Sequence, residues 1–110
     1  MAQFEIEKST NGEYYYRLKA SGNKEIILRG EQYASKAICH QGIQAIKANA
    51  GSEARYVKLQ VTNGQYYFNL KAANGEVIGT SETYTTTFNR DRGMELVKTQ
   101  APIATVEDLT

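Results

Sequence analysis

A cysteine and a histidine stand next to each other at Cys39 and His40. A thiol beside an imidazole is the combination that activates a cysteine nucleophile. The two residues fall in a stretch with helical periodicity, and consecutive residues of a helix point about 100° apart. They therefore cannot readily form the direct hydrogen bond that activation needs. We predict that Cys39 is a core residue and that His40 is solvated.

Other catalytic or metal-binding arrangements are equally weak. The chain has one histidine and one cysteine, and no carboxylates cluster around either at ligand spacing. Its glycines lie in separate predicted turns, so there is no phosphate-binding loop or dinucleotide fingerprint. Glu31 and Glu82 occupy matching places before two tyrosines; they are either facing carboxylates or hydrogen-bonding groups at the start of two helices, and we favour the second. We expect no cofactor, no metal site and no catalytic residue, and hence no enzyme.

A row of aromatic and basic residues is the more interesting candidate. On an uncovered sheet face, such residues could stack nucleobases and hold phosphates, as proteins that bind single strands do. The alternative is ordinary sheet surface, in which lysine stems cover tyrosine rings. The candidate partner-binding face consists of Tyr15, Arg17 and Lys19 with Tyr67, Asn69 and Lys71.

The overall composition limits the partner and the location. Thirteen basic and twelve acidic residues in 110 give a net charge of +1, far from the basic balance of most nucleic-acid binders. The single cysteine cannot form an internal disulfide, no apolar run approaches the ~20 residues that cross a bilayer, and the first residues lack a secretory pattern. We expect a cytoplasmic monomer without membrane association. Its partner is a protein or a small ligand, with nucleic acid as the less favoured alternative.

Two similar stretches organise the chain around these residues. Asn11-Gly12 and Asn63-Gly64 each predict a hairpin turn, and each is followed by alternating aromatic, polar and aliphatic residues typical of a strand. Residues 4–20 align with 56–72, and residues 25–50 with 76–101. The turn from Ser21 to Lys24 is one residue longer than its counterpart, in a position where insertions are tolerated.

Each repeat predicts three strands and one helix. The pattern predicts strands at 4–8, 14–20 and 25–28, and again at 55–61, 65–72 and 76–78. Ser35 and Thr86 are the expected helix caps, and Pro102 ends the second helix. Residues 103–106 have strand character, and 107–110 are expected to fray.

Two details need explanation. Val57, Leu59 and Val61 are one residue out of step with Tyr56, and either a bulge or a turn of different length would return them to the inward phase. Gly42 and Gly93 lie at the same place inside the two predicted helices, where glycine costs ~1 kcal/mol relative to alanine. We expect the helix backbone to approach the sheet or the other helix closely there.

The motifs resemble those of the YegP-like family of small bacterial proteins. They are Asn-Gly-x-Tyr-Tyr-x-x-Leu-Lys-Ala, the run from Asn74 to Tyr84, and the helical segments Gly42 to Lys47 and Gly93 to Lys98. The resemblance covers about residues 3–101. It implies two β-β-β-α-β units in one antiparallel sheet, with helices on one face and exchanged C-terminal strands. It implies no activity and supplies no catalytic residues.

The sequence thus predicts an α+β protein with a single domain at 1–110, made of a first repeat at 3–52 and a second at 53–106. The functional hypothesis is a small non-catalytic binding or interaction module, an intramolecular pseudo-dimer. The rival hypothesis is a weak single-stranded nucleic-acid binder that uses the aromatic and basic face.

Overall fold

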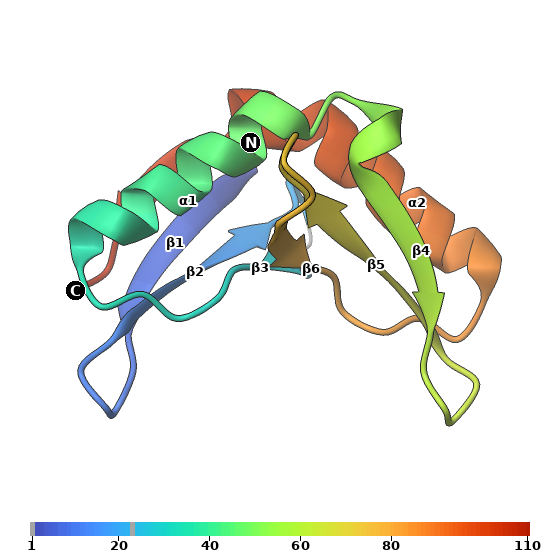
Figure 1. Ribbon diagram of the computed structural model, residues 1–110, viewed down its shortest axis with the longest axis horizontal. Coiled ribbons are helices and arrows are strands. Elements are labelled where there is room, and N and C mark those ends of the chain that lie inside the picture. The colour runs from blue at the N-terminus through green and yellow to red at the C-terminus, as the bar shows by residue number, and fades with distance from the viewer. Residues whose placement is uncertain (1, 23) are drawn as a thin grey trace.

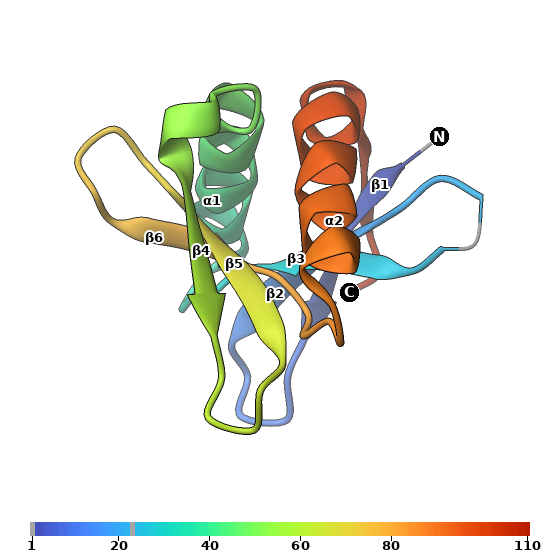
Figure 2. The ribbon, with the colours of Figure 1, turned by 90° about the vertical axis from the view of Figure 1, so that its right-hand side faces the viewer.

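The computed structural model describes residues 2–22 and 24–110 and contains one seven-stranded sheet with two helices on one face (Figures 1 and 2). The strand order is β4-β5-β6-β3-β2-β1-β7, which confirms the predicted α+β architecture. The predicted turn at 21–24 includes Asn23, which lies outside the described residues. The elements are β1 (Gln3–Lys8), β2 (Tyr14–Lys19), β3 (Ile26–Arg29), α1 (Lys36–Asn49), η1 (Glu53–Arg55), β4 (Tyr56–Gln60), β5 (Tyr66–Lys71), β6 (Val77–Thr80), α2 (Thr87–Gln100), η2 (Ala101–Ile103) and β7 (Thr105–Asp108).

The sheet has an N-terminal half, β1 to β3, and a C-terminal half, β4 to β6. The halves meet where β3 runs antiparallel to β6, through the single Cα pair Arg29 and Thr80. From this junction they diverge as two legs, with the helices along the outer side of the bend (Figure 1). α1 packs on β2 and also contacts β5 and β6, while α2 packs on β5 and contacts β3. Both helices therefore join the two halves, and the inner side of the bend remains an open face.

The last strand is exchanged between the halves. β7 follows α2 but pairs with β1, and this pairing is parallel. The sheet is antiparallel from β4 to β1, so β7 adds a parallel edge strand that the sequence pattern does not reveal. The prediction that residues 107–110 fray is wrong for Glu107 and Asp108, which lie in the strand because η2 delays its start to Thr105. Within the described chain, β4 has no strand on its outer edge.

β4 settles the question of strand phase. Tyr56 is buried and pairs with Leu70, so it faces the helices as Phe4 does in β1. Val57 and Leu59 consequently lie on the open face. The pairing of β4 with β5 runs without a register shift, so neither a bulge nor an altered turn brings these residues into the core.

The predicted helix boundaries are confirmed at their caps. The Ser35 hydroxyl accepts a hydrogen bond from the Ile38 amide at 3.2 Å, and the Thr86 hydroxyl accepts one from the Asn89 amide at 3.1 Å. Each cap satisfies an amide of the first turn that has no partner inside the helix. Pro102 lies in η2, directly after the end of α2.

The helical glycines accommodate tyrosine side chains. A Cβ atom at Gly42 would lie 2.6 Å from the Tyr33 hydroxyl oxygen, and one at Gly93 would lie 2.5 Å from that of Tyr84. The expected close approach is confirmed, but the expected neighbour is wrong. It is neither the sheet nor the other helix; it is the tyrosine of the segment before each helix.

Tyr16 links the two halves through the core. It is fully buried, and its hydroxyl donates a hydrogen bond to the Ile78 carbonyl oxygen at 2.7 Å. Its ring covers Gly30, where a Cβ atom would lie 2.0 Å from ring atom Cε2. The aligned pair in the C-terminal half is Phe68 with Ser81. The larger tyrosine ring thus lies against glycine, and the smaller phenylalanine ring has serine at the aligned position.

Removing the hydroxyl of Tyr84 and removing that of Tyr16 should have different effects on the stability of the protein. The Tyr84 hydroxyl is buried without a hydrogen-bond partner among the described residues, and burial raises its pKa to about 12. We expect Tyr84→Phe to leave the free energy of unfolding unchanged or to raise it by up to ~1 kcal/mol, because an unpaired buried hydroxyl is unfavourable. Tyr16→Phe should lower it by ~1–2 kcal/mol, because the Ile78 carbonyl loses its donor. Urea unfolding of both variants measures the difference, and an equal loss would contradict the assignment.

Candidate functional site

The six residues of the candidate face all lie on the open face and are partly buried. Tyr15, Arg17 and Lys19 belong to β2, and their counterparts belong to β5. β3 and β6 separate these strands, so the two rows lie on different legs of the sheet (Figure 1). The two rows therefore lie on the two halves of the open face, with β3 and β6 between them.

The N-terminal row belongs to an ion-pair network with β1. Lys19 lies 3.0 Å from Glu5, and Arg17 contacts both Glu5, at 4.0 Å, and Glu7. Burial alone would raise the pKa of Glu5, but hydrogen bonds from Lys19 and Gln3 and the nearby cations outweigh it and hold that pKa below 4.5. Glu5 is thus ionised at neutral pH, and Lys19 is its ion-pair partner.

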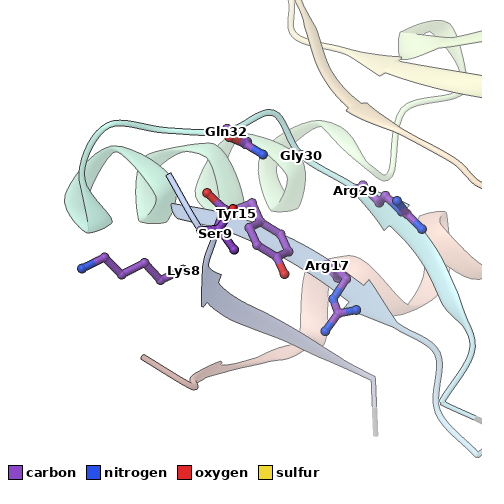
Figure 3. Close-up of a pocket in the computed structure, with 8 residues that line it drawn as sticks. Lys8, Ser9, Tyr15, Arg17, Arg29, Gly30 and Gln32 are labelled. Carbon is purple, nitrogen blue, oxygen red and sulfur yellow. The ribbon is translucent and has the colours of Figure 1, made fainter. Parts of the chain in front are cut away.

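A hollow of about 540 Å³ lies beside this network. Tyr15 stands near its centre, with Lys8 and Arg29 toward the two ends (Figure 3). The Arg17 guanidinium lies 6.0 Å from the centre of the Tyr15 ring. The full lining is Lys8, Ser9, Thr10, Tyr15, Arg17, Arg29, Gly30 and Gln32.

Sequence reasoning found two of these lining residues, Tyr15 and Arg17, and missed the others. Of the residues missed, Arg29 was the one that could most easily have been predicted, because it pairs directly with Arg17 across β2 and β3. A comparison of charge between the aligned repeats would have pointed to it, since Arg29 aligns with Thr80. Arg29 also forms an ion pair with Glu82 of the other half, with 2.5 Å between Nη2 and Oε1. Glu82 thus pairs with a cation of the other half, where the sequence favoured hydrogen bonding at the start of the helix over facing carboxylates.

The C-terminal row has different surroundings. Tyr67 pairs with Leu59, and Asn69 pairs with Val57, so apolar side chains stand where β1 carries Glu7 and Glu5. Asn69 accepts a hydrogen bond from the Thr80 hydroxyl at 3.0 Å. Tyr67 and Asn69 therefore have apolar and neutral neighbours where Tyr15 and Arg17 have carboxylates, and Lys71 is the cation of this row.

The remaining chemistry-bearing residues do not form a site. Cys39 is fully buried, and burial raises the pKa of its thiol to about 11, with the Asp108 carboxylate adding to the effect. The thiol is thus protonated and inaccessible at neutral pH, as the core assignment predicts. The described residues contain no group of histidine, cysteine and carboxylate side chains able to hold a metal ion. No helix in residues 2–22 and 24–110 combines the length and apolarity needed to span a bilayer.

The fold and this surface define a small α+β protein built from a tandem repeat, with a polar hollow on the open face of one half. The chain belongs to the family described as a domain of unknown function, DUF1508, whose profile matches residues 9–56 and again 62–108.

Named relatives and solved structures agree with this assignment. The chain is 48% identical to a UPF0339 protein of Acinetobacter baylyi, over 97% of this chain and 96% of the relative. It is 43% identical to the UPF0339 protein YegP of Escherichia coli, with the same coverage. The NMR structure of a UPF0339 protein from Shewanella oneidensis matches with a TM-score of 0.92 and 42% identity, over 99% of this chain and 92% of that one. The NMR structure of YegP from E. coli gives the same score and identity, over 99% and 93%. These relatives carry no enzyme name.

Proposed function

We propose that this protein is a small non-catalytic binding module, an intramolecular pseudo-dimer whose ligand-binding surface lies on the open face of its N-terminal half. One observation carries the proposal: a hollow of about 540 Å³ on the side of the sheet that no helix covers, lined by side chains of three strands and their loops. This volume is within the ~300–1,000 Å³ typical of small-molecule sites.

The non-catalytic part of the proposal rests on the side chains that line the hollow. The described residues of the lining supply guanidinium, ammonium, hydroxyl, phenol and amide groups but no carboxylate, imidazole or thiol that could serve as a general base. The remaining candidates are the Tyr15 phenol and the ammonium of Lys8, which lies 5.7 Å from the centre of the Tyr14 ring. Such a lining is suited to bind and orient a ligand, and its described residues place no carboxylate or imidazole beside Tyr15 or Lys8 to relay a proton.

The rival, binding of single-stranded nucleic acid along both tyrosine rows, has less support. Stacking of successive bases needs neighbouring rings and a continuous basic track. Tyr15 and Tyr67 lie on different legs of the sheet, and the cations near Tyr67 are fewer because Asn69 and Thr80 replace two arginines. It remains the second candidate.

A fragment screen by NMR tests the proposal. The ¹⁵N-labelled protein is titrated with a library of neutral, cationic and anionic small molecules, and the amide shift changes are mapped. We expect the shifts to cluster on Tyr15, Arg17, Arg29 and Gln32. The matched variant of the site is Arg17→Asn, which copies the residue found at Asn69 in the other half. Ligands that map elsewhere, or a library without any binder in the hollow, would overturn the proposal.

A further inference from the structure

Two arginines stand directly opposite each other in the hollow. Arg17 of β2 and Arg29 of β3 are Cα partners in the antiparallel ladder. Like charges at directly opposite positions destabilise a sheet. Arg17 has two carboxylate partners outside the lining, Glu7 and, at 4.0 Å, Glu5, and Arg29 has Glu82. The pair is thus tolerated, but a sheet built for stability alone would place other residues here.

The other half of the protein shows which residues meet the needs of the fold. The Cα pair aligned with the two arginines is Asn69 and Thr80, whose side chains hydrogen-bond to each other at 3.0 Å. Lys8 likewise aligns with Gln60, so all three cations of the hollow are replaced by neutral residues. Tyr15, in contrast, is repeated as Tyr67. The same strand pairing exists without the cations, so the fold does not require them.

The arginines keep donor capacity that the protein does not use. A guanidinium has five N–H donors, and a single carboxylate satisfies at most two of them in bidentate geometry. The Nε of Arg17 is buried and has no hydrogen-bond partner among the described residues. No acidic side chain is among the described residues that line the hollow. An oxyanion is the group that best fits between two guanidinium groups, because its oxygens accept from both.

Tyr15 supplies the second recognition element. Its ring stands near the centre of the hollow, beside the Arg17 guanidinium (Figure 3). A flat ring of a ligand can stack on a tyrosine face, and base stacking on aromatic side chains is a recurrent mode of binding. The hydroxyls of Ser9 and Thr10 and the amide of Gln32 add polar groups at the edge of the hollow.

We propose that the hollow binds a small phosphate monoester carrying a flat ring, such as a nucleoside monophosphate, with the phosphate between Arg17 and Arg29 and the ring on Tyr15. The inference rests on the proposed function and adds the chemical class of the ligand. It assigns the tandem repeat two roles: both halves build the fold, and one of them binds.

The test compares AMP, adenosine and inorganic phosphate as probes, by isothermal titration and by NMR shift mapping at two salt concentrations. The variant carries Arg17→Asn with Arg29→Thr, the residues that the other half already has at these places. The control carries Lys47→Gln with Lys58→Gln, which removes two positive charges at positions outside the lining of the hollow. Thermal unfolding confirms that both variants fold. We expect AMP to bind more tightly than adenosine, to weaken with salt, and to lose about tenfold in affinity for each arginine removed, with the control unchanged.

Three outcomes would overturn the inference. If neutral or cationic fragments occupy the hollow while AMP binds no better than adenosine, the ligand class is wrong and the proposed function stands. If neither these probes nor the fragment library perturb the hollow, both fail. If a single-stranded oligonucleotide binds more tightly than AMP and loses affinity on Tyr67→Ala, the nucleic-acid alternative replaces both.

Discussion

Replacing Gly30 with alanine is expected to destabilise the protein by about 1–3 kcal/mol, the cost of forcing extra atoms into a packed core. The added Cβ would lie 2.0 Å from a ring atom of Tyr16, and that ring is fully buried and anchored by its hydrogen bond to the Ile78 carbonyl oxygen. Neither partner can move freely. Chemical denaturation of the variant measures the loss.

Gly51→Ala is the matched control. Nothing lies within 4 Å of a Cβ atom at this glycine, and its backbone does not have the positive φ that disfavours alanine. The same substitution should therefore be neutral or stabilise by up to ~1 kcal/mol, since alanine reduces the entropy of the unfolded chain. Equal losses at Gly30 and Gly51 would show that contact with Tyr16 is not the cause.

The aligned pair of the other half suggests a rescue. Combining Gly30→Ser with Tyr16→Phe reproduces the Phe68 and Ser81 pair and releases the ring from its anchor on Ile78. The double variant should lose less stability than the sum of its two single variants. Additive losses in this double-mutant cycle would contradict the packing explanation.

Removing β7 by truncation after Ala104 is expected to cost about 2–5 kcal/mol, a large part of the 5–15 kcal/mol typical of domain stability. The truncation removes every β1 to β7 backbone hydrogen bond, including the one from the Leu109 amide to the Ile6 carbonyl oxygen at 2.9 Å. It also removes the ion pair of Asp108 with Lys36, 3.0 Å apart.

Amide hydrogen exchange locates the effect. Truncation should speed amide exchange in β1 by more than the loss of global stability explains. In β4, which lacks an outer partner strand in the described chain, exchange should speed up only as much as that loss explains. If the truncated chain fails to fold, a peptide of residues 103–110 added in excess should restore it by binding to β1. Uniform acceleration in both strands, or no recovery with the peptide, would show that β7 is not a local partner of β1.

The fold was predictable because its signals are local and occur twice. The Asn-Gly turns, the alternation in β2 and β5, and the caps at Ser35 and Thr86 each depend on residues close in sequence. The phase of β4 was not predictable, since a strand whose open face is apolar carries no clear alternation. Tyr56 alone supplies the core residue there, and the apolar residues Val57 and Leu59 on the opposite face hide the period.

The hollow was predictable only in part, because strand pairing brings its parts together. Tyr15 and Arg17 stand on one strand and could be read as a row, but Arg29 joins them through the ladder between β2 and β3. The separation of the two rows onto different legs depends on the order of β3 and β6 at the centre of the sheet. The helical glycines show the same limit: the repeat revealed a packing constraint at Gly42 and Gly93, but only the structure identifies the tyrosines that cause it.

The pairing of β7 with β1 also determines when the fold can be completed in a living cell. β1 is synthesised before its parallel partner β7, which follows roughly 5–20 s later at ordinary elongation rates. β4, β5 and β6 can meanwhile pair as neighbouring strands. The outer edge of β1, which carries Phe4 and Ile6, stays unpaired until β7 is made. Contacts of such high sequence separation slow folding. The outer edge of β1 is therefore exposed to aggregation and to chaperones in the nascent chain until β7 is synthesised and covers it.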